Sequence, residues 1–124
     1  MTVLFTVDHE WIDLSDSTNA IVGITQHAQD ALGDVVFVEL PEIGRSLAQG
    51  APAGVVESVK AAADVKMPVS GVVVAVNEAL REDPSLANSD PMGAGWFFKI
   101  RTTDDSQKSG LLDTTGYDAL LKTL

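Results

Sequence analysis

Lys60 and its neighbours form the stretch of this sequence best suited to chemistry, which would be acylation of the lysine amine. Three small residues, Ala61, Ala62 and Ala63, follow it directly. If this stretch is a β-hairpin, Lys60 falls near its tip, where a side chain is presented rigidly to solvent. An enzyme that acylates lysine needs such an amine with little bulk around it. The spacing alone also allows Lys60 to be an ordinary surface lysine.

The residue patterns of common catalytic and metal-binding sites are missing from the sequence. Its two histidines, His9 and His27, lie far apart and match no metal-ligand spacing. The absence of cysteine excludes a disulfide framework, a thiolate metal site and a cysteine nucleophile. There is no Gly-x-Ser-x-Gly elbow and no phosphate-binding glycine loop. We therefore expect neither a metal site nor an enzyme built from the polypeptide alone.

Composition narrows the class of protein further. The chain has 124 residues, 45 % of them hydrophobic, which suits one domain spanning 1–124 with a core of its own. Its 18 acidic and 8 basic residues give a net charge of −10, which disfavours nucleic acid and anionic membranes as partners. No apolar run approaches the ~20 residues that span a bilayer, and the first residues lack a targeting pattern. We expect a soluble, cytoplasmic protein.

Short β-branched segments bounded by turn residues must position Lys60. The pattern predicts strands over Val3–Val7, Ala20–Ile24, Val35–Leu40, Gly54–Val59, Gly71–Val76 and Trp96–Arg101. In the last of these, alternation places Trp96, Phe98 and Ile100 on one face, and Phe97 on the other beside Lys99 and Arg101. The sequence thus predicts a mostly β fold, a flattened barrel or sandwich of antiparallel sheets.

Few segments carry helical signals. Thr25 can cap a short helix through Leu32 that Gly33 ends, and Asn77 can cap one turn from Glu78 to Glu82. A final amphipathic helix is predicted by the spacing of Tyr117, Leu120, Leu121 and Leu124.

The segment from Val55 to Met67 is ambiguous. Val55, Val59, Ala62 and Lys66 could share one helical stripe, which would make the segment a helix. Its flanking Pro and Gly residues and its Val-Val start favour two strands joined by a turn. We predict the hairpin.

Several motifs in order give the chain a family resemblance. Glu57-Ser58-Val59-Lys60-Ala61 resembles the lipoyl attachment motif of the glycine cleavage system H proteins. The other matching segments run in the family's order from about residue 6 to 101: His9-Glu10-Trp11, residues 22–30 and 32–41, Pro68-Val69-Ser70-Gly71, Val76-Asn77, Asn88-Ser89-Asp90-Pro91 and Gly95-Trp96. Ala63, Lys66-Met67 and Met92 depart from the usual pattern, so local packing and docking surface there can differ from the family's.

This resemblance implies a lipoyl/biotinyl-domain-like hybrid barrel with lipoate joined to Lys60 as N6-lipoyllysine. It implies a carrier, not an enzyme, that shuttles an aminomethyl group from glycine decarboxylase (P protein) to the aminomethyltransferase (T protein). Dihydrolipoyl dehydrogenase (L protein) would reoxidise the arm, and a lipoate ligase or a lipoyl/octanoyl transferase would attach it. Two alternatives are a relay that donates lipoyl groups to other proteins and an H-like binding or regulatory module.

The resemblance also implies a cleft that shelters the loaded arm. It maps Glu10 and Asp64 onto this cleft, with Asp8 and His27 as further candidates. Each also has a plain structural interpretation, as a solvated strand residue or a turn cap. Biotin carriers attach their cofactor at a Met-Lys-Met motif, of which only Val65-Lys66-Met67 is present here, and we expect Lys66 to be a solvated residue at the end of a strand. It stands two residues before Pro68, whereas Lys60 stands eight before it and leaves room for the strand that these families place between lysine and turn.

Overall fold

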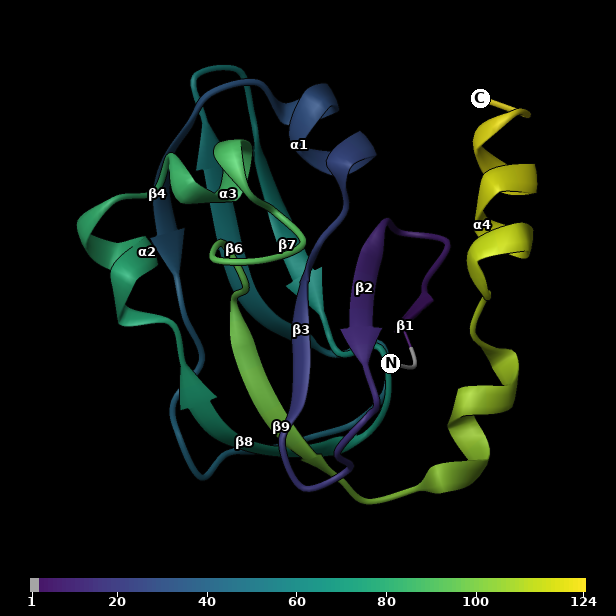
Figure 1. Cartoon of the computed structure of the whole chain (residues 1–124). Helices are drawn as coiled ribbons and strands as arrows, with labels where there is room; N and C mark the ends of the chain where they lie inside the picture. The colour runs from purple at the N-terminus through teal and green to yellow at the C-terminus, as the bar shows by residue number, and fades with distance from the viewer. Residues whose placement is uncertain (1–2) are drawn as a thin grey trace.

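The computed structural model describes residues 3–124 and consists mainly of two antiparallel sheets (Figure 1). The larger sheet has the strand order β1-β2-β3-β9-β8-β5, with bounds β1 Val3–Phe5, β2 Glu10–Asp13, β3 Ala20–Ile24, β9 Phe98–Thr102, β8 Gly71–Val76 and β5 Ser46–Leu47. The smaller sheet has the order β4-β6-β7, with bounds β4 Val35–Glu39, β6 Pro52–Ser58 and β7 Ala62–Lys66. The predicted mostly β fold is confirmed.

The ambiguous segment is a hairpin, as predicted. β6 and β7 pair antiparallel, with Glu57 opposite Ala62 at the tip end and Pro52 opposite Lys66 at the other end. Strand pairing wins over the helical stripe because it buries Val56 and Val65 in the core between the sheets, each only 1 % exposed.

Both sheets contribute to one core. Val22, Val73 and Ile100 from the larger sheet are fully buried with Val56 and Val65 from the smaller one. Phe97 is also fully buried, although the alternation places it on the same strand face as Lys99 and Arg101. The reason is that β9 begins only at Phe98, so the two-residue alternation does not extend back to Phe97.

β2 was not among the predicted strands, and one close contact fixes it against β3. Trp11 pairs with Gly23, and a Cβ on Gly23 would lie 2.7 Å from the Trp11 ring nitrogen. That nitrogen donates a hydrogen bond to the carbonyl of Pro91 at 3.0 Å. Glycine is therefore required at position 23 for the indole ring to lie flat across β3.

β4 forms one edge of the smaller sheet and contains a bulge between Val35 and Phe37. The bulge breaks the alternation, so Val36 and Phe37 are both exposed although they are consecutive.

The predicted helices are present, and two further short helices accompany them. α1 covers Gln26–Leu32 with Thr25 as its N-cap and Gly33 as its C-cap; α2 covers Glu78–Glu82 with Asn77 as its N-cap. The C-terminal helix α4 covers Thr114–Leu121, and the additional helices are α3 Leu86–Ser89 and the 3₁₀ helix η1 Asp105–Gly110. α4 flanks β1 (Figure 1), where Tyr117 stacks on Phe5 at 4.5 Å between ring centroids. None of the helices in residues 3–124 is long and apolar enough to cross a membrane.

Candidate functional site

Lys60 is an exposed residue in the connection between β6 and β7, which lies beside α1 at the top of Figure 1. The Ser58 hydroxyl accepts hydrogen bonds from the backbone N–H groups of Lys60 and Ala61, both at 3.1 Å. The Val59 N–H donates to the carbonyl of Asp34 at 3.0 Å. We call residues 58–61 the hairpin tip. Its backbone is fixed by hydrogen bonds while the lysine side chain remains accessible.

Glu10 occupies a different setting, as the first residue of β2 directly after the connection from β1. It is only 3 % exposed, its carboxylate accepts from the Thr6 hydroxyl at 2.6 Å, and the Lys66 N–H donates to it at 3.4 Å. Burial raises the pKa of Glu10, and the bonds from Thr6 and Lys66 oppose that shift only in part. We call residues 6–10 the amino-terminal corner.

Asp8 and Lys66 meet at this corner. The Lys66 ammonium lies 3.6 Å from the Asp8 carboxylate, and each side chain is about half exposed, 41 % for Lys66 and 53 % for Asp8. Asp8, Glu10 and Lys66 line a cavity of ≈ 200 Å³. Lys66 is the last residue of β7, as the sequence predicts, and its ammonium is ion-paired there.

His27 reaches the same corner from the first turn of α1. Its ring lies 4.5 Å from that of His9, centroid to centroid. His9 Nδ1 is hydrogen-bonded to the Tyr117 hydroxyl at 2.8 Å, and that hydroxyl is also bonded to Thr25 at 2.7 Å. Burial and the neighbouring His27 lower the pKa of His9, and Asp8 raises it in part. Burial raises the pKa of Tyr117.

Asp64 is exposed in the middle of β7, opposite Val55. Because strand side chains alternate, Ala62, Asp64 and Lys66 share one face of β7. This face leads from the hairpin tip toward the amino-terminal corner, about 13 Å from residue 62 to residue 66 at ~3.3 Å per residue. Figure 1 shows the end of β7 beside β2. The structure thus gathers Asp8, Glu10 and His27 at the corner and leaves Asp64 between corner and tip.

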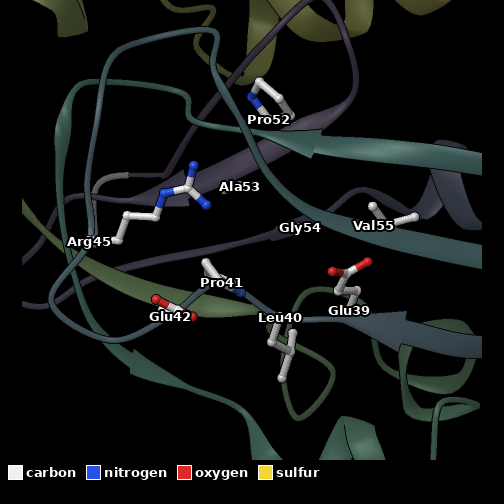
Figure 2. Close-up of a pocket in the computed structure, with 9 residues that line it drawn as sticks. All are labelled: Glu39, Leu40, Pro41, Glu42, Arg45, Pro52, Ala53, Gly54 and Val55. Carbon is white, nitrogen blue, oxygen red and sulfur yellow. The ribbon is translucent and has the colours of Figure 1, made fainter.

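A second hollow lies at the other end of the hairpin. This cavity of ≈ 430 Å³ is lined by Glu39–Glu42, Arg45 and Pro52–Val55, shown in Figure 2. It contains none of the residues proposed from the sequence. Among residues 3–124, no three His, Cys, Asp or Glu side chains are grouped to hold a metal ion.

Sequence reasoning missed several residues that build these sites. Ser58 belongs to the motif around Lys60, but nothing in the sequence indicates that its hydroxyl holds the hairpin tip. Thr6 and Tyr117 bond to Glu10 and His9 across chain separations of 4 and 108 residues. A threonine four positions before a carboxylate gives only a weak signal. The Tyr117 contact depends on where α4 packs.

Fold and tip together define a small β-sheet carrier that presents one lysine on a rigid hairpin. Comparison with known proteins agrees with this class. Residues 3–124 match the family model for the glycine cleavage H-protein. The glycine cleavage system H protein of Methylocella silvestris is 55 % identical over 122 residues, covering 98 % of this chain and 97 % of that protein. That of Chromobacterium violaceum is 57 % identical over 109 residues, 88 % of this chain and 85 % of the relative.

A solved structure agrees as well. The crystal structure of a glycine cleavage system H protein from Mycobacterium marinum superposes with a TM-score of 0.89 at 39 % identity, covering 99 % of this chain and 98 % of that one. The chain belongs to the glycine cleavage H-protein family. It is a lipoyl carrier of the glycine cleavage system and not a catalyst.

Proposed function

We propose that Lys60 is the residue that carries lipoate in this chain. The observation that carries the proposal is the hairpin tip, where Ser58 fixes the backbone while the lysine stays exposed. The residues that follow, Ala61–Ala63, are small and exposed, so a long acyl chain leaves the tip without meeting a bulky side chain. The site therefore fits the group.

Attachment needs only an accessible neutral amine and an activated acyl donor such as an acyl adenylate. The Lys60 nitrogen attacks the acyl carbon, an amide C–N bond forms and the C–O bond to phosphate breaks. Adenylate leaves with the electron pair, and the nitrogen releases a proton to solvent. A lipoate ligase or a lipoyl/octanoyl transferase would supply the donor. The product amide has lost the charge of the lysine.

Once attached, lipoate supplies a dithiolane that the P, T and L proteins of the system use in turn. The chain's own contribution is to present the arm to each partner enzyme and then to dissociate quickly from that enzyme. Its net charge of −10 suits rapid, electrostatically steered encounters that weaken with salt. The proposal includes one carrier domain over residues 1–124 and a cytoplasmic site of action.

We also propose that the loaded arm folds along β7 toward the amino-terminal corner. Asp64 lies on the strand face that leads there, and Asp8, Glu10 and His27 lie at its end. A carboxylate near the cationic amine of the loaded arm favours it electrostatically. Replacing Glu10 by Gln should shorten the lifetime of the loaded protein, followed by release of formaldehyde and ammonia. An unchanged lifetime would contradict this role.

The attachment site is tested by the intact mass of the protein expressed with lipoate available. Wild type should show one lipoyl adduct, Lys60→Ala should show none, and Lys66→Arg, which tests the competing lysine, should keep it. An adduct that persists in Lys60→Ala, or that peptide mapping places on another lysine, would overturn the assignment. A wild-type mass that never shifts would contradict the assignment as well.

A further inference from the structure

The side chain of Lys60 lies against Gly33, although the lysine is exposed. A Cβ placed on Gly33 would come within 3.0 Å of Lys60 Cε and 3.7 Å of Nζ. Gly33 is the C-cap of α1 and has φ 81° and ψ −158°, a region open to glycine and almost closed to other residues. The lysine stem therefore lies beside a stretch of backbone that has no side chain, and a methyl group at position 33 would push the stem aside by a few tenths of an ångström.

Backbone bonding joins this resting place to the hairpin tip. The carbonyl of Asp34 accepts the Val59 N–H at 3.0 Å, one residue before Lys60. The Gly33 N–H donates to the carbonyl of Gln29 at 3.0 Å, which anchors it to the last turn of α1. The Lys60 backbone is thus bonded to Ser58, the preceding Val59 is bonded to Asp34, and the lysine stem lies beside Gly33.

Asn88 on α3 holds the resting place itself. Its side-chain NH₂ donates to the Gly33 carbonyl at 2.8 Å and to Gln29 Oε1 at 3.0 Å, and its Oδ1 accepts the Val35 N–H at 2.8 Å. One amide therefore spans the end of α1 and the start of β4, using both its donor and its acceptor. Asn88 is more than fifty residues away from these partners in the sequence, and α1 and α3 lie close together in Figure 1.

We propose that Gly33 and Asn88 are positioning residues for acylation of Lys60, which rests on the proposed function above. A free lysine side chain samples many rotamers, and the acylating enzyme must select one of them. A stem that already lies on Gly33 has part of that freedom removed before the encounter, so less is lost when the amine enters the active site of the enzyme. Asn88 acts on Lys60 only through the 33–35 segment.

The first test is made on the unmodified wild-type protein by ¹³C relaxation of the lysine Cε groups. Lys60 is compared with Lys122, an exposed lysine on the C-terminal segment. The Lys60 methylene should be the more restricted of the two on the picosecond-to-nanosecond timescale. Equal mobility would overturn the proposal without any variant being made.

The second test measures kcat/KM for lipoylation by a purified lipoate ligase with ATP and lipoate. Gly33→Ala should lower kcat/KM by about 10-fold, the scale on which ordering one long side chain affects an encounter. The control is Gly50→Ala, since Gly50 has a matching φ of 82° and nothing within 4 Å of an added Cβ. Gly50→Ala should lose stability because alanine is strained at a positive φ, but it should leave kcat/KM for lipoylation unchanged. A Gly33→Ala value within twofold of Gly50→Ala would contradict the proposal.

Asn88→Asp keeps the test decisive if Gly33→Ala fails to fold. It preserves the acceptor for Val35 but removes the donors to Gly33 and Gln29, and we expect a loss of about 3-fold. In parallel, Lys60 is acetylated by a small N-hydroxysuccinimide ester, which needs no particular rotamer. This rate should stay within twofold of wild type in every variant, and a drop equal to the enzymatic one would indicate general disruption instead.

The outcomes separate the two proposals. If the adduct maps to another lysine, the attachment assignment fails. If it maps to Lys60 while kcat/KM is the same in wild type, Gly33→Ala and Asn88→Asp, only the positioning role fails.

Discussion

The hairpin tip and the amino-terminal corner are both connections between antiparallel strands, yet they use polar groups in opposite ways. At the tip, the Ser58 hydroxyl bonds only to backbone, and Lys60 extends into solvent. At the corner, Glu10 is turned inward and its carboxylate is nearly inaccessible. Presenting a reactive group thus requires only a fixed backbone, whereas enclosing one requires its desolvation.

Desolvation shifts the pKa values of the ionisable groups at the corner. Burial raises the pKa of Glu10 and lowers that of His9, so each is pushed toward its neutral form. Because burial makes the ionised form of this carboxyl costly, a nearby cation would stabilise that form. The comparison therefore predicts that changes at the corner alter stability, while changes at the tip alter acylation.

The largest effect on stability is expected from Glu10→Ala. It leaves the Thr6 hydroxyl and the Lys66 N–H without their acceptor in a buried place, which should cost about 2 kcal/mol in the free energy of unfolding. Urea denaturation at pH 7 measures it. The control is Asp8→Ala, which removes an exposed carboxylate from the same loop and should cost under about 0.5 kcal/mol. Equal losses in both variants would mean that the enclosure of Glu10 has no energetic role.

A smaller effect on stability is expected from Ser58→Ala. Three exposed hydrogen bonds of the hydroxyl are lost, so unfolding should become easier by only about 0.5–1 kcal/mol. The rate of lipoylation should nevertheless fall by about 3-fold because the backbone under Lys60 is released. Ser58→Thr keeps the hydroxyl and should restore the rate. If it does not, the bonds of Ser58 are not what presents the lysine.

The pH dependence of stability should carry the signature of Glu10. Because its folded pKa is raised, the folded state binds more protons than the unfolded chain above about pH 4.5. Glu10 therefore contributes a loss of stability as pH rises from there through the folded pKa. Between pH 4.5 and 6.5 the unfolding free energy of wild type should therefore fall relative to that of Glu10→Gln. The variant lacks the titrating carboxyl, so its unfolding free energy should depend less on pH. His9 contributes oppositely, since its lowered pKa makes stability fall as pH drops below about 6.5. Both proteins share that contribution, so the comparison cancels it.

The smallest effect is expected from Lys66→Ala. The pair with Asp8 at 3.6 Å joins two side chains that are about half exposed, and such pairs contribute about 0–0.5 kcal/mol. Urea denaturation at low and high salt should give nearly the same small difference from wild type. A loss above 1 kcal/mol would show that the corner depends on this charge as well as on Glu10.

The parts of the fold with strong local signals could be predicted from the sequence. Flanking Pro and Gly residues indicated the β6–β7 hairpin, and Thr25, Gly33 and Asn77 marked helix ends that the structure confirms. β2 escaped prediction because it is four residues long and begins with a charged residue whose burial depends on Thr6 and Lys66.

Prediction of the site was uneven for a related reason. Lys60 could be proposed from a local pattern of residue types. The role of Asn88 could not, because its three hydrogen bonds run to residues 29–35 and exist only once α3 packs beside α1. The enclosure of Glu10 likewise depends on long-range packing, and hydropathy would place such a residue in solvent.

The bulge in β4 has a consequence for how this protein behaves in a crowded solution. β4 is a sheet edge with a run of Val and Phe, the kind of strand that invites a second molecule to add to the ladder. The extra residue between Val35 and Phe37 interrupts the regular spacing of donors and acceptors. An incoming strand would lose register after a few bonds. The irregular residue in β4 therefore makes this edge a poorer template for strand addition by a second molecule.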